Sequence, residues 1–193
     1  MGKIKVPLPA KLIVGMLSAY TDTLGRAADE LSALFGPIDF ASELLPFTHS
    51  DYYNAELGTP ILRQFLSFER LFDQGALSQA KHLTNALEQS LAIEGRRTVN
   101  LDPGYVTGAK LVLATTKDYN HRIYIGNGIY AEVTLHYHKG HFQPWPWTYP
   151  DYASPEYLSL FERIRCIYMS QLRDCRQAQQ ETTNLGPKQK PLD

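Results

Sequence analysis

The narrowest constraint on the fold comes from a strictly alternating stretch in the second half of the chain. From Ile129 to Tyr137, apolar or aromatic residues occupy every second position, with polar or amphipathic residues between them. Side chains alternate between the two faces of a strand, so this period of two predicts a half-buried β-strand. The segment from His121 to Ile125 also alternates, and Gly126-Asn127-Gly128 between the two segments tolerates positive φ. The sequence therefore predicts a β-hairpin.

The loop length of this hairpin follows from the requirement that apolar side chains share a face. A two-residue turn would place Ile123 opposite Glu132 and mix the faces. A three-residue loop instead pairs Ile123 with Ala131, and Arg122 with Glu132. The favoured interpretation of the second pair is an ion pair on a solvated face, worth about 0.2–1 kcal/mol. The alternative is half of a binding site, in which Arg122 holds an anion and Glu132 acts as a base or metal ligand.

The size and charge of the chain narrow the classes of protein to which it can belong. With 193 residues it can form one domain with a substantial core, and its net charge of −1 provides no overall field that would attract nucleic acid or a membrane. The apolar run near the N-terminus is too short and too interrupted for a signal peptide or a membrane span. Cys166 and Cys175 lie in one predicted helix and form no disulfide framework, which indicates a reducing, cytoplasmic environment.

Strand and helix patterns alternate along the first half of the chain. An almost unbroken apolar run predicts a buried strand over 11–17, and helical spacing predicts a helix over 21–35 that Gly36 and Pro37 end. Further strands are predicted over 38–47, within 62–72 and over 97–101, with a polar loop over 49–58 and a second helix over 77–91. This β-α-β-β-α-β order is that of the ferredoxin-like fold, an antiparallel sheet with both helices on one face.

The rest of the chain extends this α+β arrangement by the hairpin and a final helix. Residues 108–116 are predicted as a helix, although the apolar residues at its centre would equally suit a strand. Ser154, Pro155 and Glu156 supply the N-cap, the first-turn proline and the first-turn acid of the last helix. After residue 176 the composition becomes rich in Gln, Thr, Pro and Lys. It predicts one globular domain over 1–176 and a disordered tail over 177–193.

Several runs of the sequence resemble a prokaryotic family described only as a domain of unknown function, DUF4416. The resemblance rests on VNLDPGY, KLVLATTKD, HRIY, GIYAEVTL and WTYPDY, and extends to KLIVGML, FGPIDF, PFTHSDYY and SFERL nearer the N-terminus. It covers about residues 10–175. The family has no settled activity, so the resemblance implies no catalytic residue and no cofactor. The chain also lacks the GxxxxGK[ST] loop with which P-loop proteins hold phosphates.

The segment Asp102-Pro103-Gly104-Tyr105 follows a predicted strand, and two interpretations of it stay open. Proline followed by glycine suits the central positions of a type II turn, which is the favoured interpretation. The alternative places the Asp102 carboxylate at a sheet edge as a base or metal ligand, with Tyr105 among the residues that bind the ligand.

A second candidate site lies between the predicted 108–116 helix and the hairpin. Hydroxyls, two cations and an imidazole fall within eight residues, namely Thr115, Thr116, Lys117, His121 and Arg122. Arginine can hold two oxygens of a phosphate or carboxylate and lysine adds a point charge, so such a set suits an anion. The alternative is a polar helix end that leads into a strand, and the two interpretations have equal weight.

Histidines and aromatic residues crowd the region after the hairpin. His136, His138 and His141 have a spacing that a metal can use, but they flank a Lys-Gly turn and no metal site is predicted. The aromatic residues would either line a cleft that stacks on a base or sugar, or cap an end of the sheet with their polar tips in water. This aromatic and acidic group consists of Asp51, Tyr52, Tyr53, Trp145, Trp147, Tyr149, Asp151 and Tyr152.

Three functions from different classes fit these residues, and the sequence does not decide whether the protein is an enzyme. The favoured function is to bind or act on a small anionic ligand, phosphorylated or nucleotide-like, in a cleft formed by residues 102–152. The alternatives are an RNA- or nucleotide-binding module that uses the sheet and its tyrosines, and a protein–protein adaptor that uses the Trp and Tyr side chains. The catalytic candidates are Asp102, Glu132 and His121, and the ligand-binding candidates are Thr115, Thr116, Lys117, Arg122, Tyr105, Trp147 and Tyr149.

Overall fold

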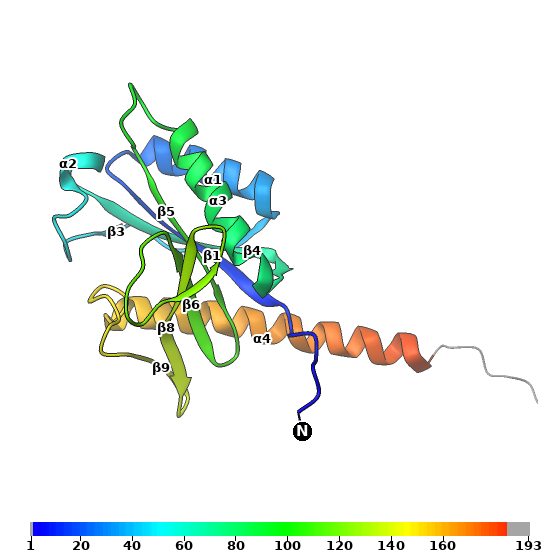
Figure 1. The fold of residues 1–193 in the computed structure, drawn as a ribbon. Coiled ribbons are helices and arrows are strands. Elements are labelled where there is room, and N and C mark those ends of the chain that lie inside the picture. The colour runs from blue at the N-terminus through cyan, green and yellow to red at the C-terminus, as the bar shows by residue number, and fades with distance from the viewer. Residues whose placement is uncertain (1, 185–193) are drawn as a thin grey trace, which may run out of the picture.

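A computed structural model describes residues 2–184, which form an antiparallel sheet packed between helices (Figure 1). The strands are β1 (Ala10–Ser18), β2 (Ile38–Ala41), β3 (Leu45–Pro46), β4 (Leu62–Phe72), β5 (Asn100–Val106), β6 (Lys110–Thr115), β7 (Ile123–Gly126), β8 (Ile129–His138) and β9 (His141–Pro144). The helices are α1 (Thr21–Phe35), α2 (Asn54–Leu57), α3 (Leu77–Ser90) and α4 (Pro155–Asn184), with a 3₁₀ turn at Gln74–Ala76. The hydrogen-bonded order is β2-β4-β1-β5-β6-β8-β7, with β3 also paired to β4 and β9 to β8.

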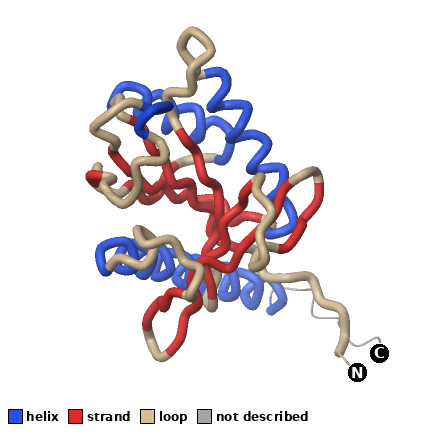
Figure 2. The backbone as a smooth tube through the Cα atoms, turned by 60° about the vertical axis from the view of Figure 1, so that its left-hand side comes forward, coloured by secondary structure: helices blue, strands red, loops and turns tan. Residues whose placement is uncertain are grey.

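Helices cover both faces of the sheet, which gives the molecule three layers (Figure 2). On one face, α1 and α3 pack on β1 and β4 through a core that includes Leu31, Leu87, Val14 and Phe68. These residues recur at helical spacing in α1 and α3 and at alternate positions in the strands, so the apolar pattern of the sequence places this core.

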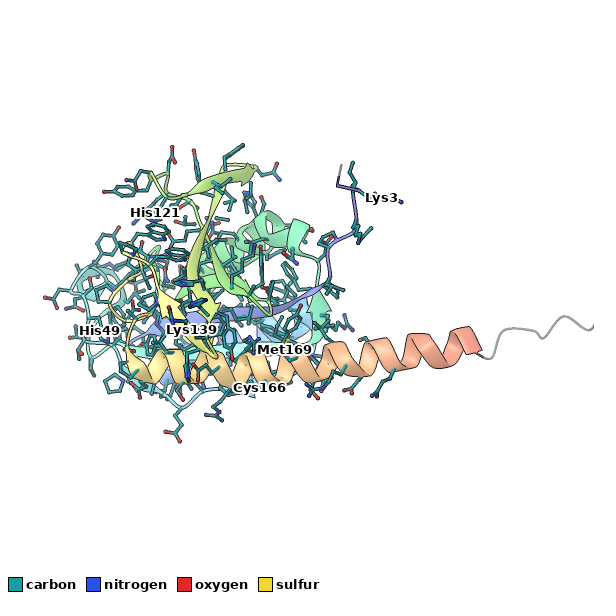
Figure 3. All side chains as sticks on the ribbon, turned by 90° about the horizontal axis from the view of Figure 1, so that it is seen from below. Lys3, His49, His121, Lys139, Cys166 and Met169 are labelled. Atoms are coloured by element: carbon teal, nitrogen blue, oxygen red, sulfur yellow. The ribbon has the colours of Figure 1, made fainter. Side chains whose placement is uncertain are left out.

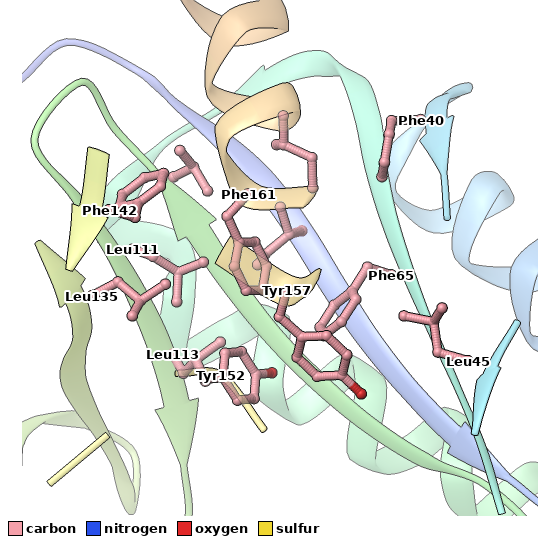
Figure 4. Close-up of a cluster of buried hydrophobic side chains, with 13 residues drawn as sticks. Phe40, Leu45, Phe65, Leu111, Leu113, Leu135, Phe142, Tyr152, Tyr157 and Phe161 are labelled. Atoms are coloured by element: carbon pink, nitrogen blue, oxygen red, sulfur yellow. The ribbon is translucent and has the colours of Figure 1, made fainter. Parts of the chain in front are cut away.

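The opposite face of the sheet is covered by the first half of α4. Phe65 of β4 lies at the centre of this core, with its ring centroid 4.9 Å from that of Tyr157 and 5.0 Å from that of Phe161 (Figure 4). The C-terminal part of α4 projects beyond the sheet (Figure 1). Residues 177–184, predicted as the start of a disordered tail, continue α4, and residues 185–193 of that predicted tail lie outside the described part of the chain.

The α+β class and the antiparallel sheet agree with the prediction, but the sheet is larger than the four strands of a ferredoxin-like fold. β6, β8 and β7 continue it beyond β5, so the order of the whole sheet differs from the ferredoxin-like order. The strand predicted over 38–47 is divided into β2 and β3, and the loop predicted over 49–58 contains the short helix α2. The added strands at the β5 edge help to enclose the pocket described below.

The helix predicted over 108–116 is wrong, because these residues form β6. Leu111 and Leu113 contact the core beneath α4, while Val112 and Ala114 contact the core beside the start of α3. A strand that is buried on both faces is apolar at successive positions, so no period of two distinguishes it from a buried helix.

The hairpin and its pairing of Ile123 with Ala131 are confirmed, but the three-residue loop is wrong. A bulge at Ile125 lets Gly126 pair with Ile129, which leaves a two-residue loop at Asn127 and Gly128. The single apolar face predicted for β8 does not extend to its end, however. A bulge between Val133 and Leu135 reverses the faces, so Val133 packs beside the start of α3 and Leu135 packs beneath α4. Glu132 lies on the α4 side and is buried, which corrects the expectation of a solvated face.

Candidate functional site

A pocket lies where the sheet opens between β5 and β6. β1 pairs with β5 along residues 100–106, but β6 pairs with β5 only from Gly104 to Val106. Residues 100–102 of β5 therefore have no strand on that edge. A pocket of about 740 Å³ occupies the opening, a volume typical of small-molecule sites.

The type II turn predicted at Asp102-Pro103-Gly104-Tyr105 is wrong, because all four residues lie within β5. Pro103 is just outside the part of β5 that pairs with β6, where a residue without an N–H is tolerated. Asp102 lines the pocket, whereas Tyr105 lies in the core beside the start of α3 and does not line it. The segment thus marks the point at which β5 and β6 separate.

One face of α3 forms a wall of the pocket. Its lining residues are Lys81, Asn85, Glu88, Gln89 and Ala92 just past its end, which recur every three or four positions. This spacing places them on one side of the helix. The other walls come from the end of β6 and from the segments 47–56 and 149–152, so the pocket joins parts of the chain that are far apart in sequence. His49, labelled in Figure 3, lies at the end of the molecule opposite to the projecting part of α4.

Arg63 of β4 forms the floor of the pocket and is 3% exposed. Its guanidinium carbon lies 5.3 Å from the ring centroids of Phe47 and Phe65, and its Nη2 donates a hydrogen bond to Asp151 Oδ2 at 3.2 Å. Its Nε and Nη1 have no hydrogen-bond partner among the described residues. Burial works to lower the pKa of Arg63, but Tyr152 and the neighbouring carboxylates raise it overall, so the guanidinium stays charged.

Arg63 fits at this depth because the neighbouring strand carries a glycine. A Cβ on Gly15 would lie 2.9 Å from Arg63 Nη1 and 3.2 Å from the Tyr152 hydroxyl. Any side chain at residue 15 would displace one of these two groups. Beside them, Asp102 Oδ2 accepts a hydrogen bond from Asn100 Nδ2 at 2.7 Å, and its Oδ1 lies 3.5 Å from Lys81 Nζ.

The rim of the pocket carries the cations predicted from the sequence. Lys117 Nζ donates a hydrogen bond to the Tyr52 hydroxyl at 3.1 Å. Arg122 Nε donates to Glu132 Oε2 at 2.8 Å, as the predicted register requires, and its Nη2 donates to the Tyr149 hydroxyl at 2.8 Å. Burial lowers the pKa of Arg122, but the bond to Glu132 and the other contacts raise it overall.

The far end of the pocket holds an ion-pair network around Arg97. Arg97 Nη2 donates to Glu56 Oε2 at 2.6 Å, and its Nη1 donates to Glu88 Oε2 at 3.0 Å. Glu88 Oε1 also accepts a hydrogen bond from the Leu101 amide at 2.6 Å. Burial raises the pKa of Glu88, although Lys81, this amide and Arg97 oppose the shift.

The charges around the pocket are almost all paired. Each lining carboxylate has a cation within ion-pair distance; the pairs are Glu56–Arg97, Glu88–Arg97, Asp102–Lys81, Asp102–Arg63, Asp151–Arg63 and Glu132–Arg122. Lys117 is different, because its ammonium pairs with no carboxylate in the described part of the chain and contacts only Tyr52. The site therefore has spare capacity for a negative charge at its rim.

The structure brings most of the predicted site residues to one pocket. Those that line it are Asp102, Glu132, Thr115, Thr116, Lys117, Arg122 and Tyr149. His121 lies behind the pocket, where its Nε2 is 3.1 Å from Glu132 Oε2. Trp147 stacks on His121, with centroids 5.4 Å apart, and lines no part of the pocket.

The aromatic and acidic group divides in two, apart from Asp51, which does not line the pocket and accepts a hydrogen bond from Asn54 Nδ2 at 2.8 Å. Tyr52, Tyr53, Tyr149, Asp151 and Tyr152 line the pocket. Trp145 and Trp147 instead stack on each other at 5.2 Å outside it, and each also contacts a histidine ring. His136 belongs to this stack, and no group of three metal-binding side chains occurs among residues 2–184.

The sequence interpretation missed Arg63, Lys81 and Arg97, which supply three of the pocket's cations. For Arg63 a signal existed, because it shares one strand face with Phe65 and is therefore a charge on an apolar face. For Lys81 and Arg97 the sequence contains no comparable signal. Lys81 lies in a predicted helix and Arg97 follows a loop, and polar residues are common in both places.

Replacing Tyr152 by phenylalanine is expected to raise the free energy of unfolding by up to about 1 kcal/mol. The Tyr152 hydroxyl is buried and has no hydrogen-bond partner among the described residues, so its removal relieves an unmet polar group. Urea denaturation of Tyr152→Phe measures the change. A loss of more than about 1 kcal/mol would show that the hydroxyl has a partner in the folded protein.

Comparison with known proteins identifies a family but no function. The model of a family described as a domain of unknown function, DUF4416, matches residues 8–168. No curated protein and no solved structure matches the chain. In the described residues, no helix has the length and apolar character needed to cross a membrane. All residues that line the pocket fall within the range that the family model matches.

Proposed function

The chain belongs to the family DUF4416, and we propose that it binds a small anionic ligand, phosphorylated or nucleotide-like, in the pocket between β5 and β6. The observation that carries the proposal is the set of cationic donors that the carboxylates of the pocket leave unused. Every lining carboxylate already has a cation, yet among the described residues Lys117 pairs with no acid and two nitrogens of Arg63 form no hydrogen bond. A ligand anion would give Lys117 the acidic partner that it lacks.

At the rim, phenol hydroxyls occupy the positions that a ligand anion would take. Tyr52 accepts from Lys117 and Tyr149 accepts from Arg122. A phenol is a neutral acceptor, whereas a phosphate or carboxylate adds the attraction between opposite charges to the hydrogen bond. An anion would therefore displace the two hydroxyls, and the nearby hydroxyl of Thr116 would add a further donor.

At the floor, Arg63 adds a charge that water screens only weakly. Its guanidinium is surrounded by the rings of Phe47, Phe65 and Tyr152, so its field reaches the pocket through a medium of low polarity. Its Nε and Nη1 form no hydrogen bond with the described residues, and buried donors without such a bond destabilise a protein. Such groups need an explanation, and a role in binding supplies one.

Among the three catalytic candidates, Asp102 has the exposure that contact with a ligand requires. Its side chain is 27% exposed, whereas that of Glu132 is 2% exposed and is shared between His121 and Arg122. We assign Glu132 and His121 to positioning Arg122, and Asp102 to contact with the ligand as a base if a reaction takes place.

The fold proposal is that β1, β2, β4 and β5 with α1 and α3 form a ferredoxin-like unit. The consecutive neighbours β2-β4-β1-β5 and the common face of the two helices support it, while β6, β8 and β7 lie outside the unit. This relationship carries no functional conclusion, because folds of this kind serve many functions.

A thermal-shift screen against phosphorylated and carboxylated metabolites, each beside its uncharged parent compound, tests the proposed function. At about 100 times its dissociation constant a ligand adds about 2.7 kcal/mol, or roughly 5–11 °C for a domain of this size. We expect the charged compounds alone to shift the midpoint, and Lys117→Met to weaken their binding about tenfold or more.

The matched control for Lys117→Met is Lys3→Met, which removes the same charge from an exposed position outside the pocket. The control is expected to bind as the wild type does. Equal losses in the two variants would show that the effect is one of overall charge. The absence of any shift from charged compounds would contradict the proposal itself.

A further inference from the structure

Two carboxamides on the α3 wall of the pocket have unused hydrogen-bonding groups. Asn85 and Gln89 are four residues apart, so they lie on the same face of the helix, and both line the pocket. In the described part of the chain, neither side chain forms a hydrogen bond or contacts an ion. Their donors and acceptors are therefore available to a ligand.

The charged residues on the same wall are already engaged. Lys81 Nζ donates to the Leu101 carbonyl at 2.8 Å, and Glu88 is held by the Leu101 amide and by Arg97. This part of the wall consequently offers a ligand two neutral amides, whereas the rim offers it Lys117 and Arg122. The pocket thus has a cationic rim and, on its α3 wall, two neutral amides between charges that are already paired.

The chemistry of the carboxamide restricts which ligand group can lie against the α3 wall. Each group presents one carbonyl acceptor and an amino group with two donor hydrogens. An apolar ligand group that displaced the water around these atoms would leave them unpaired, which is unfavourable. A group with adjacent donors and acceptors, such as the hydroxyls of a sugar or the edge of a nucleobase, satisfies both side chains.

The size of the pocket supports a ligand with two parts. Its volume of about 740 Å³ is in the upper part of the range for small-molecule sites, more than an inorganic anion at the rim would fill. We infer that the ligand is a phosphorylated or carboxylated compound with a sugar or nucleobase part, and that Asn85 and Gln89 determine specificity by binding this part. The inference rests on the proposed function, because Lys117 and Arg122 must hold the anionic end.

Isothermal titration with three classes of probe tests the inference. The probes are a nucleoside monophosphate, a sugar phosphate and inorganic diphosphate, titrated into the wild type and into the double variant Asn85→Leu/Gln89→Met. We expect the wild type to bind at least one of the two organic phosphates ten times or more tightly than diphosphate. The double variant should bind the organic phosphates no more tightly than diphosphate. Its affinity for diphosphate should be within twofold of that of the wild type. Preference for the nucleotide over the sugar phosphate assigns the amides to the base, and equal affinity assigns them to the sugar.

Two controls separate the failure of this inference from failure of the proposed function. Gln79→Met removes the same group from an exposed position of α3 outside the pocket and should change no affinity. Lys117→Met should weaken all three probes. Suppose that Lys117→Met weakens all three probes but the double variant still prefers the organic phosphates to diphosphate. The inference is then overturned and the anion site stands. The same conclusion follows if diphosphate binds the wild type as tightly as the organic phosphates do. If no probe binds, or Lys117→Met weakens none, both fail.

Discussion

The Lys11→Met variant is expected to lose about 3–5 kcal/mol of unfolding free energy, because it leaves a poorly exposed carboxylate without its cation. Lys11 of β1 is fully buried. Its ammonium donates hydrogen bonds to the Asp39 carboxylate, to the Phe68 carbonyl at 2.7 Å and to Gln171 Oε1 at 2.9 Å. One side chain thus joins β1, β2, β4 and α4, and urea denaturation of the variant measures what that junction contributes.

The loss is large because the partner carboxylate cannot recover its hydration. Asp39 is 14% exposed and, after the substitution, keeps one side-chain hydrogen bond, from Ser67 Oγ at 2.6 Å. Burial lowers the pKa of Lys11, while the hydrogen bond and charge of Asp39 oppose this shift. The two charges therefore depend on each other, and removing one exposes the full desolvation penalty of the other.

A second substitution isolates this penalty. Lys11→Met/Asp39→Asn leaves no buried charge, so it is expected to recover most of the stability that Lys11→Met loses. Glu56→Gln breaks the more exposed pair with Arg97, whose carboxylate is 44% exposed, and should lose no more than about 1 kcal/mol. Should Lys11→Met lose as little as Glu56→Gln, the Asp39 carboxylate would not carry the expected desolvation penalty.

Lys11 also shows which parts of the fold can be predicted from the sequence and which cannot. The strand over 11–17, the helices at Thr21–Phe35 and Leu77–Ser90, and the Ile123–Ala131 pair follow from periodicity and capping within a few residues. The burial of Lys11 depends on Asp39 and on Gln171, which lie 28 and 160 residues away. The pattern of neighbouring residues in the sequence cannot indicate partners that are so far away.

The pocket residues likewise include some that the sequence predicts and some that it does not. The cluster over 115–122 was predicted because its polar residues are neighbours in the chain, and the partner Glu132 was predicted from the hairpin register. The convergence of Asp102 with this cluster depends on β5 and β6 lying side by side, and β6 has no strand pattern because both its faces are buried. Arg63 reaches the same pocket from β4, across β1, so only the complete sheet order reveals it.

The second large effect is expected at the point where β5 and β6 part, from Gly104→Ala. A Cβ on Gly104 would lie 2.4 Å from the Val112 carbonyl oxygen and 2.7 Å from Leu113 Cδ2. The first of these contacts is with the backbone, which cannot rotate away, so the two strands must separate. Overpacking costs about 1–3 kcal/mol and occasionally more, and we expect a loss at the upper end, about 3 kcal/mol.

A glycine in α1 provides the matched control for this substitution. Gly25 is exposed, and a Cβ there would meet nothing within 4 Å, so Gly25→Ala should gain about 0.5–1 kcal/mol from the better helix propensity of alanine. Urea midpoints for the two variants should therefore move in opposite directions. Because Gly104 forms the first β5–β6 pair beyond the pocket, Gly104→Ala should also weaken ligand binding, which Gly25→Ala should leave unchanged. A gain in stability from Gly104→Ala would mean that β5 and β6 do not pack this closely, and that the pocket does not begin where their pairing ends.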